Sequence, residues 1–370
     1  MSNIQVMEPQ STTSQEQQPT QRPQIPPLEW LKEIQIRSNQ ELSKLLKYSS
    51  PKALTWLGMN KSSHYSILSI RKKNGTSRVL HNPDTLLRGA QYHILNGILN
   101  NIKVPEYIWA FERNKSIPAM ARLHTNKEFV ISVDIKDFFT SIKQHYLMEV
   151  FTSLGIAEKP ARTLSELCTY KSFVPQGALT SPKIANLVTA ATFGPIIKAY
   201  CDTKPCLTMT IYADDITISS TDSTIDVSEI LQEVSNAIRC AGFRVNREKT
   251  KVMRKKNRQY VCGVVVNKKT NMLKKDRYKL RAIVHNTTKN GIEAEALKSS
   301  VESGIFASHI KGKINWLKQL NPSLGKKSDD KFEAYLETLL TPSALDNTKI
   351  ETETEAGTSK SITEPEALPW

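Results

Sequence analysis

Two adjacent acids, Asp214 and Asp215, interrupt a stretch in which apolar and polar side chains alternate. Residues 207–212 precede the pair and residues 216–219 follow it, and both runs have the period of two that is typical of β-strands. The stretch therefore predicts a β-hairpin with two carboxylates at its tip. Neighbouring carboxylates repel each other and are unfavourable between apolar strands unless a cation neutralises them. A solvated turn is the simpler alternative, because aspartate is common in turns.

A third acid, Asp134, follows an apolar, β-branched run over residues 129–133. This run predicts a largely buried strand that delivers the carboxylate at its end. If the strand lies beside the hairpin, the three acids can hold two Mg²⁺ ions, roughly 3.5–4 Å apart, against the attacking and leaving oxygens of a phosphoryl transfer. Oxygen ligands with no neighbouring His or Cys favour Mg²⁺ or Mn²⁺ over zinc.

The rest of the chain alternates between helical and strand periodicity without an internal repeat, which predicts an α+β fold. We expect helices over residues 28–48 and 84–101, and a basic hairpin over residues 64–80 with an Asn-Gly turn. Residues 1–27 are rich in Gln, Ser, Thr and Pro, and residues 341–370 are acidic and lack periodicity. Both ends are predicted to be disordered tails.

The charge of the chain indicates a polyanionic partner. Lys and Arg number 51 against 36 Asp and Glu, which gives a formal net charge of +15. A basic surface that serves only solubility is the alternative. From residue 251 to residue 281 there are twelve Lys or Arg and a single acid, with aromatic side chains between them. This density favours contacts with RNA phosphates whose strength falls steeply with salt, and the candidates are Lys255, Lys256, Arg258, Lys268, Lys269, Lys274, Lys275, Arg277 and Arg281.

The five cysteines have neither the spacing of a zinc site nor that of a disulfide framework, so we expect free thiols in a reducing compartment. No apolar run approaches the roughly 18–20 residues that span a bilayer, and Met1 is not followed by a leader pattern. The sequence therefore predicts a cytoplasmic protein with no membrane partner.

Residues 211–216 resemble the Tyr-x-Asp-Asp box of reverse transcriptases, and further motifs stand in the order of that family. Residues 133–142 resemble its first metal-binding motif. The resemblance implies that Asp134 is a metal ligand and that the backbone carbonyl of Ile135 is a second contact. With the two hairpin acids, these groups form the expected catalytic metal site.

In the same motif, Phe139 stands where the family places an aromatic ring under the sugar. The resemblance implies that its bulk excludes a 2′-hydroxyl and so selects deoxynucleotides. Phe138 is read as a core residue, and the same reading remains open for Phe139.

Residues 174–182 resemble the Pro-Gln-Gly box, which implies that Gln176 and Gly177 line the nucleotide pocket. Gly177 permits close backbone approach, and Gln176 can hydrogen-bond the base pair or the sugar. As a plain loop before a helix, Ser181-Pro182 would need no function.

Residues 241–251 resemble the next motif, in which Lys249 lies beside the triphosphate and acts as general acid toward pyrophosphate. A solvated charge run is the alternative. In the basic hairpin, the cations that would grip the incoming phosphates are Arg71, Lys72, Lys73 and Arg78, with Arg78 the best placed.

As a whole, the resemblance implies a right-hand polymerase. The expected parts are fingers over residues 28–128, a palm with an antiparallel sheet over residues 129–270, with fingers helices inserted at about 143–173, and an RNA-binding helical thumb over residues 271–340. We expect Trp316 and Leu317 to point into the thumb.

Within the family, the chain resembles bacterial retron reverse transcriptases. Residues 116–124 resemble their Asn-Ala-x-x-His element with Met120 in place of Asn, and residues 261–263 resemble their Val-Thr-Gly element with Cys262 in place of Thr. The resemblance implies a structured non-coding RNA as template and primer, deoxynucleotides as substrates, a branched RNA–DNA product (msDNA), and an effector protein in anti-phage defence. A group II intron-like or other defence reverse transcriptase with a different primer, and a catalytically silent RNA-binding scaffold, remain the alternatives.

Overall fold

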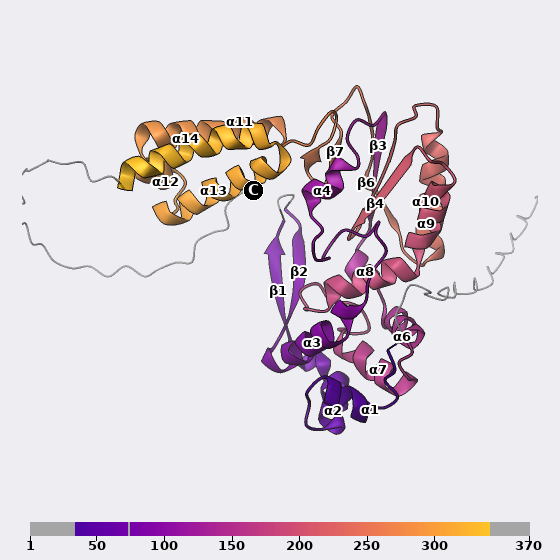
Figure 1. Cartoon of the computed structure of the whole chain (residues 1–370). Coiled ribbons are helices and arrows are strands. Elements are labelled where there is room, and N and C mark those ends of the chain that lie inside the picture. The colour runs from indigo at the N-terminus through magenta and orange to yellow at the C-terminus, as the bar shows by residue number, and fades with distance from the viewer. Residues whose placement is uncertain (1–33, 73–74, 341–370) are drawn as a thin grey trace, which may run out of the picture.

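The computed structural model describes residues 34–72 and 75–340 (Figure 1). A four-stranded sheet stands beside a lobe of helices that carries a projecting hairpin, and a separate helical bundle extends to one side. The expected tails, residues 1–27 and 341–370, lie outside the described residues.

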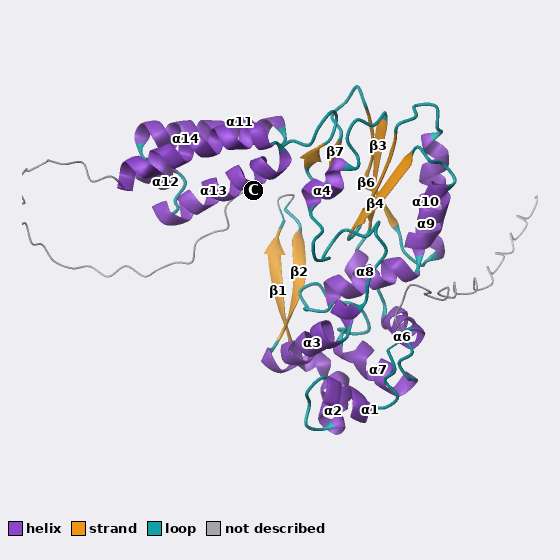
Figure 2. Cartoon of the chain, in the orientation of Figure 1, coloured by secondary structure: helices purple, strands orange, loops and turns teal. Residues whose placement is uncertain are grey.

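The sheet is fully antiparallel, in the order β4-β5-β3-β6 (Figure 2). Its strands are β3 (Phe129–Ile135), β4 (Leu207–Tyr212), β5 (Asp215–Ser220) and β6 (Val245–Arg254). Strand β3 is buried on both faces, because Ile131 and Val133 belong to the main core and Val130 to a second cluster on the other side. Helices α9 (Phe193–Asp202) and α10 (Val227–Cys240) pack along the main-core side.

The lobe beside the sheet holds the helices whose apolar faces complete the main core. They are α1 (Asn39–Leu45), α2 (Pro51–Met59), α3 (Thr85–Gly97), α6 (Gln144–Ser153), α7 (Glu158–Leu167) and α8 (Ser181–Ala191). Smaller elements are α4 (Ile117–Arg122), α5 (Phe138–Ser141), β7 (Tyr260–Val261), β8 (Val264–Val265), and the 3₁₀ turns Lys61–His64 and Leu99–Asn101.

The prediction of a helix over residues 28–48 is wrong for residues 34–38, which are not helical. Helix α1 begins at Asn39, after Ser38, whose hydroxyl accepts a hydrogen bond from the Glu41 N–H. Such a cap starts a helix and does not continue one. Upstream, Ile36 is extended and forms a parallel bridge with Ile156. Tertiary pairing therefore overrides the local helical pattern.

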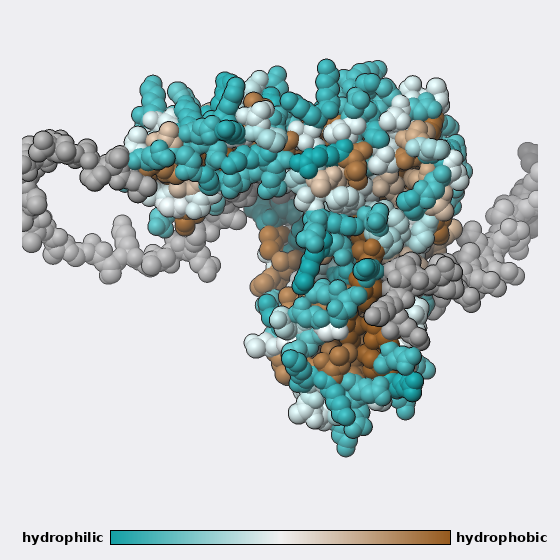
Figure 3. Space-filling model, in the orientation of Figure 1, coloured by the Kyte–Doolittle hydropathy of each residue, from teal (hydrophilic) through white to brown (hydrophobic). Residues whose placement is uncertain are grey.

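The expected basic hairpin is present as β1 (Tyr65–Arg71) and β2 (Ser77–Pro83), with Gly75 at a φ of +82° in the turn. Its base is packed, because Tyr65 and His81 contact the ring of Tyr170. The outer half is exposed on both faces, and apolar side chains gather over it in Figure 3. The exposed apolar residues there are Ile67, Leu68, Ile70 and Val79.

The bundle contains α11 (Lys274–Asn290), α12 (Ile292–Lys298), α13 (Ser303–Leu320) and α14 (Pro322–Leu340), with its own apolar core. Leu317 is buried in that core as expected, whereas Trp316 is partly buried and packs on the second cluster beside the sheet. The corner between α13 and α14 is fastened there as well. Thr270 Oγ1 donates to the Leu320 carbonyl at 2.8 Å, and Arg122 donates to the Gln319 carbonyl at 2.8 Å.

The α+β class with an antiparallel sheet is confirmed. The five cysteines, all among the described residues, are free thiols. No single described helix has the length and apolar character needed to cross a membrane; α8 and α9 meet the criterion together, but they bend by 51° at their junction and α8 is a core helix.

A pair of glycine substitutions tests the crossing of α13 and α14. A Cβ on Gly325 would lie 2.4 Å from the Lys318 Cα, so Gly325→Ala forces the helices apart. We expect it to lower the free energy of unfolding by about 1–3 kcal/mol. A Cβ on Gly312 of α13 would meet no atom within 4 Å. Gly312→Ala should therefore raise the free energy of unfolding by up to about 1 kcal/mol. Urea unfolding followed by circular dichroism measures both, and equal effects would contradict the close crossing.

Candidate active site

The tip of the β4–β5 hairpin is a tight turn that presents Asp214. Tyr212 pairs with Asp215, so only Ala213 and Asp214 connect the strands. Ala213 has a φ of +56°, which costs an L-residue roughly 1–2 kcal/mol and is sustained by the flanking strand pairs. The Asp214 carbonyl accepts a hydrogen bond from the Ile135 N–H at 2.9 Å. The turn is therefore bonded to the end of β3.

Strand pairing brings the three acids together. Asp134 on β3 lies directly opposite Asp215 on β5, and side chains directly opposite in an antiparallel pair project from the same face. Asp215 is held from behind, because Ser132 Oγ donates to one of its oxygens at 2.8 Å and Cys262 Sγ lies 3.9 Å from the other.

The electrostatics of this cluster favour a cation. Burial raises the pKa values of Asp214 and Asp215, and the neighbouring carboxylate of Asp134 raises both further. Lys249 and Arg78 act against the shift at Asp214. One buried oxygen of Asp134 has no hydrogen-bond partner, whereas the other accepts from Lys249 Nζ at 3.1 Å. This donor set suits a hard divalent ion. No three acidic, His or Cys side chains between residues 34 and 340, the masked pair 73–74 aside, form a ready-made cage.

Lys249 reaches Asp134 because β6 carries a bulge. Ser132 pairs with Lys251, but Asp134 pairs with Asn246, so residues 247–250 lie opposite only one residue of β3. Bulges of this kind redirect side chains and are common beside active sites. Sequence reasoning identified the lysine from its motif but predicted neither the strand nor the bulge.

A cleft of about 720 Å³ opens above the acids, between the sheet and the β1–β2 hairpin. Of the residues expected in the site, its lining includes Arg78, Asp134, Ile135, Phe139, Gln176, Gly177, Asp214 and Lys249. Asp215 lies behind this lining. On the hairpin, Lys72 lines the cleft and Arg71 does not, while Lys73 lies outside the described residues.

The Pro-Gln-Gly loop is attached to the hairpin through its backbone. The Gln176 carbonyl accepts from the His81 N–H at 2.7 Å. Gly177 has a φ of +113°, and a Cβ there would lie 2.7 Å from the His81 carbonyl oxygen. The close backbone approach expected at Gly177 is thus an approach to β2, and it fixes Gln176 at the wall of the cleft.

The two neighbouring phenylalanines have different surroundings. Phe138 is buried among Phe193 and Phe243 in the main core, as expected. Phe139 is partly exposed and packs on the edge of the same core, and both rings line the cleft. Phe139 thus combines a core contact with a surface that faces the cleft.

Phe111 lines the cleft and was missed by sequence reasoning. Its backbone φ is +60°, an outlying value for a bulky residue, and its half-exposed ring lies 6.3 Å from that of Tyr212. The loop is anchored by Glu112, which pairs with Lys183 at 2.7 Å and accepts from Asn186 at 2.9 Å. No spacing or periodicity marks this loop, because its position depends on α8.

The two retron-like elements that differ from the family pattern, residues 116–124 and 261–263, contribute to the same second cluster. Met120 is fully buried in the second cluster, which also contains Val261 and partly buried Cys262. Nearby, His124 bridges Ser219 and Thr210 at 2.7 and 2.8 Å, and burial lowers its pKa to about 3. This imidazole is neutral at physiological pH and joins β4 to β5.

The residues expected to contact RNA lie at the surface, from the end of β6 to the first two turns of α11. Eight are exposed and Arg277 is partly buried, although Lys255 is paired with Glu128. On α11, the exposed ring of Tyr278 has three cations 5.6–5.7 Å from its centre. Hydrophilic side chains cover most of the bundle face in Figure 3. An exposed aromatic ring among cations suits a stacked base and its phosphates.

Comparisons with known proteins agree with this geometry. The family model described as reverse transcriptase (RNA-dependent DNA polymerase) matches residues 70–273. The chain is 30% identical to the Retron Ec86 reverse transcriptase of Escherichia coli, over 60% of this chain and 69% of the relative. It is 29% and 28% identical to the Retron Mx65 and Mx162 reverse transcriptases of Myxococcus xanthus, over 71% and 79% of this chain and 63% and 66% of theirs.

The chain thus spans about two thirds of the length of these curated relatives. Among solved structures, telomerases from Candida tropicalis and Candida albicans align with TM-scores of 0.41 at 12% identity, over 60% and 75% of this chain and 59% and 61% of theirs. The family match covers more than half of the chain and includes every motif residue that lines the cleft. The chain therefore belongs to the reverse transcriptase family of RNA-directed DNA polymerases, as a retron-type member.

Proposed function

We propose that this reverse transcriptase extends DNA on a structured partner RNA by two-metal-ion nucleotidyl transfer at Asp134, Asp214 and Asp215. The observation that carries the proposal is the pairing of β3 with β5, which gathers these acids at the foot of the cleft. The family works with an RNA template, a DNA product and, in general, divalent metal ions.

The metal ligands proposed are the unpartnered oxygen of Asp134, the carboxylate of Asp214 and the backbone carbonyl of Ile135. Asp215 lies behind the lining of the cleft, where it adds negative charge, and is the fourth candidate metal ligand. Two Mg²⁺ ions, or Mn²⁺ in their place, supply charge neutralisation at the attacking and leaving oxygens. Substrate phosphates and water are needed to complete the coordination, since Mg²⁺ usually keeps such ligands.

The remaining lining residues bind the deoxynucleotide. Arg78 and Lys72 face the acids from the hairpin and hold the phosphates, and Lys249 protonates the departing pyrophosphate. Gln176 contacts the base pair or sugar, and Phe139 lies under the sugar.

The parts of the chain fit the roles of a right hand. We assign the fingers to residues 28–128 with the inserted helices α6 and α7, the palm to residues 129–270, and the thumb to residues 271–340. The support is the position of the hairpin above the cleft and the separate core of the α11–α14 bundle.

The partner is a structured non-coding RNA held on the basic surface between β6 and α11. As in retron systems, this RNA supplies the template and a 2′-hydroxyl primer, which gives a branched RNA–DNA product, and an effector protein acts with it in anti-phage defence. The retron relatives and the Tyr278 platform among its cations support this assignment.

Asp214→Asn is expected to reduce Mg²⁺-dependent deoxynucleotide incorporation by at least about a thousandfold, because it removes a charged metal ligand. RNA affinity should stay nearly unchanged, since binding rests on a distant surface. Primer extension and a filter-binding assay measure the two effects. Asp222→Asn, at a partly exposed acid in the turn after β5, is the matched control. Undiminished synthesis by the Asp214 variant would refute the metal assignment.

Phe139→Ala is expected to admit ribonucleotides, because the ring no longer occupies the space of the 2′-hydroxyl. The preference for a deoxynucleotide over its ribonucleotide should fall by at least about tenfold. Single-nucleotide incorporation kinetics measure this ratio, with Phe139→Tyr as the variant that keeps the ring. If sugar selectivity does not change in the alanine variant, Phe139 does not act as the steric gate.

The retron assignment predicts that nucleic acid purified with the protein from its native host contains a 2′,5′ branch. Treatment with a debranching enzyme should separate the DNA from its RNA and change the mobility of the product. Sequencing of both parts then identifies the template. DNA without such a branch would indicate a reverse transcriptase that uses another primer.

A further inference from the structure

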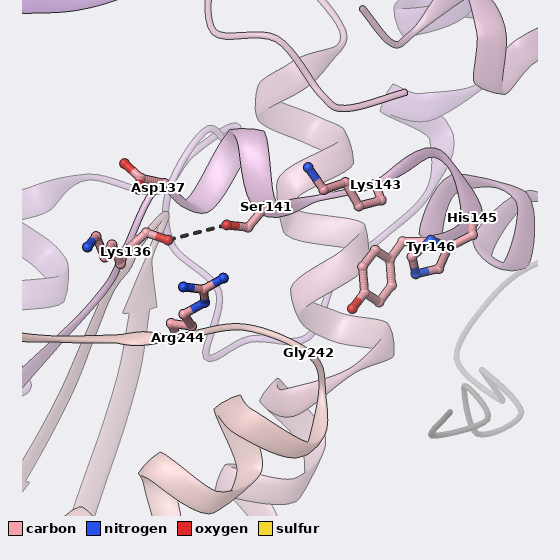
Figure 4. A pocket seen from close by; sticks show the side chains of 8 residues that line it. All are labelled: Lys136, Asp137, Ser141, Lys143, His145, Tyr146, Gly242 and Arg244. Carbon is pink, nitrogen blue, oxygen red and sulfur yellow. Dashed lines mark hydrogen bonds between the residues drawn. The ribbon is translucent and has the colours of Figure 1, made fainter. Parts of the chain in front are cut away.

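A second cavity, of about 390 Å³, adjoins the active-site cleft (Figure 4). It lies where β3 ends, between the start of α6 and the loop before β6. Lys136 and Asp137 line both cavities. The second cavity is therefore a neighbour of the cleft, on the far side of the segment that follows the catalytic acid of β3.

The lining of this cavity is strongly basic. Lys136, Lys143 and Arg244 are its basic side chains, and Asp137 is the single acidic one. In Figure 4 the guanidinium of Arg244 lies between Lys136 and the ring of Tyr146, and the Asp137 carboxylate points away from it. Within the described ranges 34–72 and 75–340, no acid forms an ion pair with Lys136 or Arg244. Cations gathered without acidic partners create a positive potential that attracts anions.

The wall that carries Arg244 is fixed by backbone contacts. The Arg244 carbonyl accepts from the Lys136 N–H at 2.8 Å. Tyr146 donates its hydroxyl to the Ala241 carbonyl at 2.6 Å, and a Cβ on Gly242 would lie 2.5 Å from that hydroxyl. With a φ of +80°, Gly242 allows the loop to pass beneath the ring. The guanidinium thus projects from a constrained support.

We propose that this cavity binds inorganic pyrophosphate as it leaves the active site. The inference rests on the proposed polymerase function. In that reaction the priming hydroxyl, which is the 2′-hydroxyl of the RNA for the first nucleotide and the 3′-hydroxyl of the DNA afterwards, gives its proton to solvent and its oxygen bonds to the α-phosphorus. The bond from that phosphorus to the bridging oxygen breaks, and pyrophosphate departs with a proton from Lys249. Pyrophosphate carries several negative charges and matches planar guanidinium and ammonium donors.

The position of the cavity favours this anion over a phosphate of bound RNA. Arg244 precedes Val245, which pairs with Ile135 at the catalytic end of β3. The basic surface assigned to RNA follows Arg254, which pairs with Phe129 at the opposite end. The two basic regions therefore stand at different ends of the same strand.

Arg244→Ala tests the proposal through the response to pyrophosphate. Loss of one charge-assisted contact should raise the inhibition constant of pyrophosphate by roughly tenfold or more and slow pyrophosphorolysis at subsaturating pyrophosphate to a similar degree. The maximal rate at saturating deoxynucleotide should stay within about twofold of wild type, because Arg244 does not line the cleft. Arg239→Ala, an exposed arginine at the end of α10, is the matched control, and Arg244→Lys should behave between the two.

Calorimetric titration of inorganic pyrophosphate into the protein without nucleic acid separates this proposal from the polymerase function. Weaker binding to the Arg244→Ala protein supports the site even if synthesis fails. If wild type synthesises DNA but the variant keeps its inhibition constant and its pyrophosphate affinity, the cavity proposal is overturned alone. A loss of RNA affinity with an unchanged response to pyrophosphate would overturn it as well.

Discussion

Repulsion between carboxylates is the constraint around which this molecule is arranged. The β3–β5 ladder holds Asp134 against Asp215, and the strained turn at Ala213 adds Asp214. Burial makes the charges costly, as the raised pKa values of Asp214 and Asp215 indicate. The cations that offset them come from separate elements, Arg78 from the hairpin and Lys249 from the bulge in β6. The site therefore depends on contacts between elements that are far apart in the sequence.

The cleft is assembled by backbone contacts between its walls. The Pro-Gln-Gly loop is bonded to β2 at His81, and residues 107–109 are bonded to the edge of β4 at Ile211. Each contact fixes a lining side chain, Gln176 in the first case and Phe111 in the second. Backbone attachment suits this purpose, because it fixes position with little dependence on side-chain rotamers. The hairpin is the exception, since the residues of its outer half are exposed.

Local patterns predicted strands β3, β4 and β5, both hairpins and the three acids, because alternation and turn chemistry depend on near neighbours in sequence. Local patterns did not predict the structure where contacts between distant segments determine it. The helix expected before Asn39 is replaced by a bridge to Ile156, and the choice of Lys72 over Arg71 at the cleft depends on the orientation of the hairpin. The bulge that delivers Lys249 and the loop that presents Phe111 have no local signature. Both altered retron elements, at Met120 and Cys262, fall in one apolar cluster, a relation that sequence order alone does not reveal.

The contacts described above between the bundle and the rest of the molecule all lie at one end of the bundle. There the chain enters α11, Thr270 and Arg122 bond the Leu320 and Gln319 carbonyls at the α13–α14 corner, and Trp316 packs on the second cluster. A rigid body attached at one end can swing about that end while its length stays fixed. The Tyr278 face would then move over an arc at a constant distance from the attachment, and could follow an advancing duplex without a change of reach.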